Sequence, residues 1–103
     1  DGNLHPLIMF DASRGDELAR ATEFGARILE LSVDVGGTIT GEHGVGIEKV
    51  QQMCVQFSPD ELDAFHALKA AFDPPRLLNP GKAVPTPRHC SEYRLTGSAR
   101  EAT

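Results

Sequence analysis

The sequence predicts an α+β domain in which a few-stranded sheet is covered by helices. Three features support this: an apolar run over residues 4–10, helical periodicity over residues 16–35, and β-branched residues at 38–40. Strand, long helix and strand in this order form a βαβ unit, whose right-handed crossover would make the strands parallel. We therefore expect a ferredoxin-like fold. Two strands are marginal as a sheet, so we expect the sheet to continue in upstream sequence or in a partner chain.

The first predicted strand, residues 4–10, ends at a turn formed by residues 11–15. Pro6 has no backbone N–H, which moves this part of the strand to a sheet edge or to the strand's start. His5 would then lie where the strand begins.

The predicted helix 16–35 has one apolar or small-residue face at three- and four-residue spacing, formed by Leu18, Ala21, Gly25, Ile28, Leu29 and Ser32. Phe24, Leu31 and Val35 widen this face, so we expect much of the helix to be buried. Ser13 and Asp16 have the spacing of a weak capping box. Gly36 and Gly37 would end the helix, because glycine readily adopts the left-handed conformation found there.

Two further helices are predicted in the second half. The first is short and covers residues 46–53. The second starts after Ser58, with Pro59 as the favoured first helical residue and Glu61 completing a capping box. Its buried face would comprise Leu62, Phe65, Leu68 and Phe72. We expect residues 1–90 to form the domain and residues 91–103 a poorly ordered tail.

Composition limits the class of protein. With 40% hydrophobic and 24% charged residues, the chain suits one globular domain. It has no apolar run of about 18 residues, so we expect no membrane span. A net charge of −5 without a basic patch argues against nucleic acid as a partner. The first residue is Asp1, within an apparent motif, which suggests a piece of a longer protein.

Cys54 and Cys90 form no C-x-x-C pair. We expect two free thiols in a reducing, cytoplasmic setting, with a single disulfide as the open alternative. No secretory signal is visible at the start of the sequence.

The candidate chemistry centres on Glu42 and His43, which lie among Gly41, Gly44 and Gly46. A carboxylate can hold a divalent metal ion, and an imidazole can move a proton near neutral pH. A second fragment of this kind, residues 1–5, ends at His5. A βαβ unit would bring the two together, and a His/Glu set with open positions is typical of catalytic zinc-type sites.

Each candidate also has a structural explanation. A histidine at a strand edge is often satisfied by backbone, and residues 1–3 are compatible with a simple turn. Asn79 and Lys82 are compatible with a capped and solvated turn. The glycines on both sides of a charged pair are harder to explain structurally, and they favour a site.

Three segments carry a family resemblance: Asp-Gly-Asn-Leu-His-Pro at 1–6, Gly-Gly-Thr-Ile-Thr-Gly-Glu-His-Gly-Val-Gly at 36–46, and Phe-Asp-Pro with Leu-Asn-Pro-Gly-Lys within 72–82. In order and spacing they resemble the C-terminal domain of FAD-linked oxidases over about residues 1–90. The resemblance is strongest to the group that contains FAD-binding glycolate oxidase subunits and D-lactate and D-2-hydroxyglutarate dehydrogenases.

The resemblance implies oxidation of a D-2-hydroxy acid, of glycolate or D-lactate type, to the 2-oxo acid with hydride passing to FAD. It implies that His5 and Glu42 are metal ligands and that His43 is the base. Asn3 would contact the substrate, and Asn79, in a closing turn that packs toward the flavin domain, would contact the cofactor. His and Glu ligands suit zinc, manganese or iron.

The resemblance also implies what is missing. The family has another metal-binding histidine just before Asp1, and its flavin domain and substrate-binding arginine lie further upstream. We therefore expect no activity from this chain alone, weak metal binding or none, and self-association through exposed apolar surface. Its partners would be the remainder of the flavoprotein and other oxidase subunits, through which it could associate with a membrane.

Two other classes remain open. A non-catalytic ferredoxin-like module for ligand binding or assembly would need the βαβ packing but no proton acceptor beside a carboxylate. A free-standing zinc hydrolase ranks last, because the sequence lacks an H-E-x-x-H helix.

Overall fold

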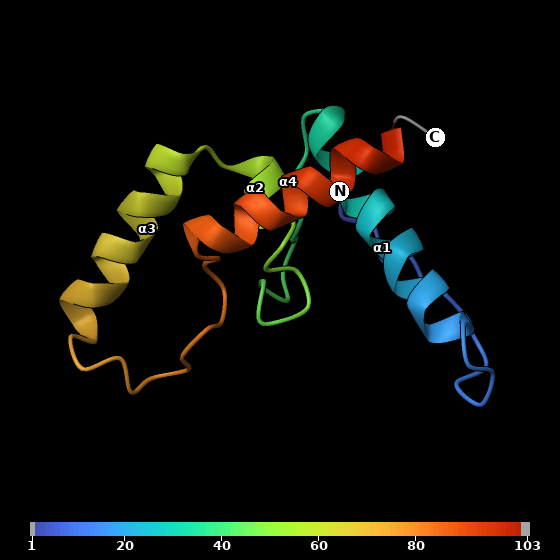
Figure 1. Cartoon of the computed structure of the whole chain (residues 1–103), viewed down its shortest axis with the longest axis horizontal. Helices are drawn as coiled ribbons and strands as arrows, with labels where there is room; N and C mark the ends of the chain where they lie inside the picture. The colour runs from blue at the N-terminus through green and yellow to red at the C-terminus, as the bar shows by residue number, and fades with distance from the viewer. Residues whose placement is uncertain (1, 102–103) are drawn as a thin grey trace.

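The structure, a computed structural model, describes residues 2–101, with side chains described through Leu95. Within this range it contains four helices: α1 (Glu17–Asp34), α2 (Met53–Gln56), α3 (Pro59–Phe72) and α4 (Pro87–Glu101). Helices α1 and α3 lie on opposite sides of the molecule, and α4 crosses between them (Figure 1).

The predicted α+β, ferredoxin-like βαβ fold is wrong, because residues 2–101 contain no strand. Residues 4–10 run beside α1, where Ile8 Cδ1 lies 3.5 Å from the position of a Cβ on Gly25. No backbone hydrogen bond between described residues joins residues 4–10 to residues 38–40. β-branched and apolar residues favour a strand only where a neighbouring strand completes the ladder.

Helix α1 begins and ends within one residue of the predicted bounds. Its N-cap, Asp16, makes no capping hydrogen bond from its side chain, so the Ser13–Asp16 capping box is absent. Ser13 donates instead to Asp11, from its backbone N (2.9 Å) and from its hydroxyl (2.6 Å). At the other end Gly36 has φ +90°, and Gly37 N donates to Ser32 O at 2.7 Å. The predicted glycine stop is confirmed.

The apolar face of α1 is only partly covered. Leu18, Phe24 and Leu31 are each more than half exposed, and no residue of α1 is fully buried. The periodicity therefore identified the helix correctly but not a buried interface within this chain.

The second predicted helix is shorter and begins later. Residues 47–52 form turns, and the helix covers only Met53–Gln56. The start of α3 is confirmed: Glu61 N donates to Ser58 Oγ (3.2 Å), and Ser58 N donates to Glu61 Oε1 (3.0 Å). Of its predicted buried face, Leu62 is buried, but Leu68 and Phe72 are largely exposed.

The core lies where α2, α3 and α4 meet. The buried apolar side chains of the described residues are Ile39, Val50, Met53, Cys54, Leu62, Pro85 and Cys90. Cys54 and Cys90 are joined by a disulfide with Cα atoms 5.3 Å apart, so the prediction of two free thiols is wrong. The argument from free thiols to a reducing compartment loses its basis.

Residues that we expected to be poorly ordered, 91–103, continue α4 up to Glu101, and residues 102 and 103 lie outside the described range. Besides the disulfide, Tyr93 fixes this helix. Its hydroxyl donates to the Glu30 carboxylate of α1 and accepts a hydrogen bond from Gln52.

After α3 the chain forms a tight turn around Asp73. This buried carboxylate accepts hydrogen bonds from Leu77 N (3.1 Å) and Leu78 N (2.9 Å), and it pairs with Lys69. Further along, Ala83 N donates to Gly46 O at 2.8 Å. The turn is thereby joined to the loop that follows Ile39.

The chain is more open than a typical monomer of its size. Its accessible surface is 8010 Å², whereas a compact protein of 11.1 kDa exposes about 5,700 Å². The radius of gyration is 15.1 Å, compared with about 13 Å for a compact domain. Among the described residues, no helix is both long and apolar enough to cross a bilayer.

Candidate functional site

The loop from Thr40 to Gly44 carries Glu42 and His43. It follows Ile39, which is 2% exposed and whose N–H donates to the Gln56 side chain at 2.9 Å. At the loop's ends, Thr40 Oγ1 accepts from Gly44 N (2.9 Å) and donates to Gly44 O (3.2 Å). Gly44 has φ +80°, a conformation that side chains rarely adopt. The buried residue before the loop and the hydroxyl across it hold Glu42 and His43 at an exposed tip.

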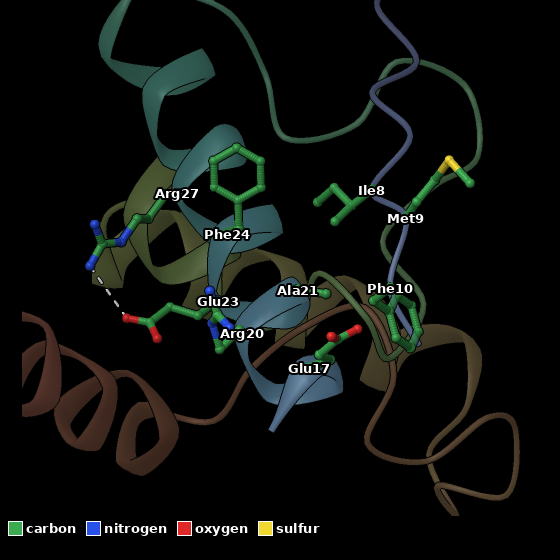
Figure 2. A pocket seen from close by; sticks show the side chains of 9 residues that line it. All are labelled: Ile8, Met9, Phe10, Glu17, Arg20, Ala21, Glu23, Phe24 and Arg27. Carbon is green, nitrogen blue, oxygen red and sulfur yellow. Dashed lines mark hydrogen bonds and ion pairs between the residues drawn. The ribbon is translucent and has the colours of Figure 1, made fainter. Parts of the chain in front are cut away.

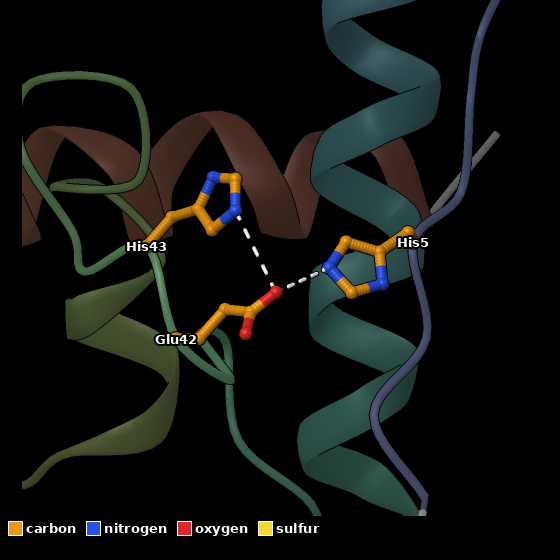
Figure 3. A group of neighbouring side chains, drawn as sticks. All are labelled: His5, Glu42 and His43. Atoms are coloured by element: carbon orange, nitrogen blue, oxygen red, sulfur yellow. Dashed lines mark hydrogen bonds and ion pairs between the residues drawn. The ribbon is translucent and has the colours of Figure 1, made fainter.

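His5 reaches this tip from the segment beside α1 (Figure 3). His5 Nε2 lies 2.6 Å from Glu42 Oε1, although the two residues are 37 positions apart. His43 Nε2 lies 3.7 Å from the same oxygen, and the two imidazole rings are 6.0 Å apart. The sequence-predicted His5, Glu42 and His43 are therefore close neighbours.

Asn3 lies against the same loop. A Cβ on Gly41 would lie 2.8 Å from Asn3 Cγ and 3.0 Å from Asn3 Nδ2. Contacts this close leave no room for a larger residue while Asn3 keeps its place. Glycine at position 41 thus allows the N-terminal segment to approach the loop, and Asn3 lies beside the His5–Glu42 pair.

The chemistry of these groups fits a divalent cation. One ligand atom each from His5, Glu42 and His43 lies within 4.8 Å of the others. Two ligands of a tetrahedral zinc ion, each at about 2.0–2.1 Å, lie roughly 3.4 Å apart, so small side-chain movements would suffice. Imidazole nitrogen with carboxylate oxygen suits zinc, manganese or iron.

The cluster is open to solvent. The side chains of His5, Glu42 and His43 are 64%, 55% and 77% exposed. Charges at such positions interact weakly through water and are screened by salt. This surface alone provides no water-excluding wall.

Asn79 contacts its own turn. It adopts φ +44°, which asparagine tolerates better than most residues, and its Oδ1 lies 3.5 Å from Lys82 Nζ. The turn meets the 40–46 region through the Ala83–Gly46 hydrogen bond. The backbone therefore gives a reason for asparagine at this position that is independent of any cofactor.

A groove of about 550 Å³ lies between residues 8–10 and one face of α1 (Figure 2). Its walls combine apolar side chains such as Ile8 and Phe24 with charged ones such as Glu17, and none of the predicted site residues lines it. Sequence analysis missed this groove. It also missed the role of Thr40. The available indication was that Thr40 is a hydroxyl residue four positions before a glycine.

Comparison with known proteins agrees with the family resemblance. Residues 1–83 match the family model of FAD linked oxidases, C-terminal domain. The chain is 62% identical over 93 residues to glycolate oxidase subunit GlcD of Escherichia coli K12, covering 90% of this chain and 19% of that protein.

More distant relatives point the same way. Glycolate oxidase subunit GlcD of Bacillus subtilis is 49% identical over 82 residues, covering 80% of this chain and 17% of that protein. D-lactate dehydrogenase of Archaeoglobus fulgidus is 40% identical over 86 residues, covering 82% of this chain and 18% of that protein. This chain thus spans less than a fifth of the length of these relatives, and no solved structure matches it significantly. The chain belongs to the family of FAD-linked oxidases, whose C-terminal domain it matches over most of its length.

Proposed function

We propose that this chain is the C-terminal part of a flavin-dependent oxidoreductase that oxidises a D-2-hydroxy acid, of glycolate or D-lactate type, to the 2-oxo acid. The family match and the names of the relatives support the reaction class. The observation that carries the proposal is that His5, Glu42 and His43 converge from two separate segments.

In this proposal His5 Nε2 and Glu42 Oε1 hold a divalent zinc, manganese or iron ion. The two atoms face each other at 2.6 Å, and a small outward movement of either side chain would let both reach one ion. When bound, the cation supplies positive charge against the substrate's hydroxyl and carboxylate oxygens, and FAD supplies the acceptor for the hydride from C2.

His43 acts as the general base. Its neutral Nε2 accepts the proton of the substrate hydroxyl while the C2 hydrogen leaves as hydride and the C=O bond forms. The Glu42 carboxylate oxygen lies 3.7 Å from that nitrogen. Because His43 is exposed, the proton can pass to water afterwards.

Asn3 orients the substrate. Its side-chain amide can donate to the substrate carboxylate or hydroxyl from a position against Gly41, next to the His5–Glu42 pair. Asn79 is assigned to the flavin side of the site, since its turn is joined to this region through Ala83 and Gly46.

The chain alone is expected to be inactive. The site is more than half exposed, and hydride transfer to a flavin needs a flavin domain and a surface that excludes water. The remainder of the flavoprotein and other oxidase subunits are the partners that would provide them.

The proposal is tested in a longer protein that contains this chain together with a flavin domain. His43→Gln should lower kcat on D-2-hydroxy acids by about 10²–10⁴-fold, the usual contribution of a general base, with flavin content unchanged. His5→Ala and Glu42→Gln should lower the content of bound metal.

His89→Gln is the matched control, because His89 is an exposed histidine on α4. Unchanged kcat in His43→Gln would refute the base assignment, and unchanged metal content in both ligand variants would refute the metal site.

A further inference from the structure

We infer that Thr40 is a positioning residue that holds Glu42 and His43 in the arrangement that meets His5. The inference rests on the proposed function, in which these three side chains form the metal and proton-transfer site. It is carried by the two hydrogen bonds that join Thr40 Oγ1 to the backbone of Gly44.

The Thr40 hydroxyl closes the loop at its base. It accepts from Gly44 N and donates to Gly44 O, so a single oxygen satisfies both backbone groups of that residue. Only Gly41, Glu42 and His43 lie between the two joined residues. Fixing Thr40 against Gly44 therefore restricts the directions in which the Glu42 and His43 side chains can point.

Thr40 is itself well anchored. Ile39, immediately before it, is buried and bonded to Gln56 of α2. The Thr38 hydroxyl donates to Thr40 O at 2.6 Å. Thr40, on one side of these hydrogen bonds, is thus held by the core. Gly44, on the other side, belongs to a loop whose glycines allow many backbone conformations.

Glycine makes this anchor necessary. With Gly41, Gly44 and Gly46 around them, Glu42 and His43 occupy a backbone that has many accessible conformations. Ligand affinity falls in proportion to the fraction of time that the competent arrangement is populated. If the loop without these hydrogen bonds adopts the metal-binding arrangement about 10–20% of the time, metal binding would weaken about 5–10-fold.

The test compares three variants of this chain. Thr40→Val removes the hydroxyl while keeping the shape, Thr40→Ser retains the hydroxyl, and Thr22→Val is the control. Thr22 is a threonine whose hydroxyl donates to Leu18 O within α1, away from the loop. Zn²⁺ is titrated while the His5 and His43 ring protons are followed by NMR, a method suited to weak binding.

Thr40→Val should bind Zn²⁺ about 5–10-fold more weakly, whereas Thr40→Ser and Thr22→Val should stay near the parent value. In the metal-free chain, the Gly44 amide should exchange faster in Thr40→Val only, because its acceptor is lost. If the role of Thr40 were purely structural, Thr40→Val would lower thermal stability without selectively weakening Zn²⁺ binding or speeding exchange of the Gly44 amide. Thr40→Ala serves as the second hydroxyl-free variant if Thr40→Val does not fold.

Equal Zn²⁺ affinity in Thr40→Val and the parent chain would overturn the inference. If the parent chain alone binds no Zn²⁺, the metal site is tested in the longer protein described above, and the metal-free chain decides on Thr40. There, a His5–His43 ring-proton contact that is lost in Thr40→Val and kept in Thr40→Ser supports positioning. Persistence of this ring-proton contact in Thr40→Val contradicts a positioning role for Thr40.

Discussion

The disulfide between Cys54 and Cys90 should contribute a large share of the stability of this chain. It closes a loop over a sequence separation of 36 residues, for which the loss of chain entropy in the unfolded state predicts about 4 kcal/mol. Single domains are stable by about 5–15 kcal/mol in total. The two cysteines are also among the few buried apolar side chains of the described residues, so few other contacts can compensate.

The perturbation is the double variant Cys54→Ser/Cys90→Ser, compared with the parent chain in urea unfolding followed by helical circular dichroism. With a slope of about 1.5 kcal/mol per molar urea, the midpoint should fall by roughly 2.5–3 M. The parent chain under a dithiol reductant should behave like the double variant, and titration of free thiols reports the state of the bond. Equal midpoints for the parent chain and the double variant, with no free thiols in the parent, would refute this reasoning.

Two further predictions concern Asp73 and the exposed apolar surface. The hydrogen bond from Lys69 is the main cause that lowers the pKa of Asp73 below its usual 3.8, with help from the backbone of Leu78. The stabilisation that this carboxylate provides should therefore be complete above about pH 4 and be lost as the pH falls further through the folded-state pKa. Urea midpoints from pH 2 to 7 should show a smaller acid decrease in Asp73→Asn than in the parent, and parallel curves would contradict the assignment. Separately, exposed side chains such as Leu7, Phe24 and Phe72 should drive self-association, so light scattering should give a mass that rises with concentration. A constant monomer mass would contradict this expectation.

Local sequence patterns predicted the end of α1 and the start of α3 correctly. The start of α3 at Ser58 and the glycine stop after α1 depend on hydrogen bonds between residues at most five positions apart, which a sequence displays directly. The disulfide depends on two cysteines far apart in the chain, and nothing in their spacing indicated that they would meet.

The two predicted strands failed for a related reason. Residues 4–10 and 38–40 have strand-like composition, but a ladder needs a partner backbone, and the described residues provide none. Residues 47–52, predicted as helical, form turns instead, next to Gly46 with its φ of +55°.

The structure brings the predicted residues His5, Glu42 and His43 together, but not on the predicted scaffold. We expected paired strands to bring His5 to Glu42. In the structure the close packing of Asn3 on Gly41 accompanies their meeting, and residues 2–101 contain no strand that could do so. The motif around Glu42 and His43 could be recognised in the sequence because its residues are contiguous. The hydrogen bonds that shape this loop also join residues within it.

The exposed face of α1 has a consequence for how substitutions in this chain are judged. Leu18, Phe24 and Leu31 are each more than half exposed here, so serine at these positions should change the stability of the isolated polypeptide little. In a full-length relative that covers this face, each change would forgo about 1.5–3 kcal/mol of burial. Mutational tolerance measured on the short chain would therefore underestimate the selective constraint on these side chains.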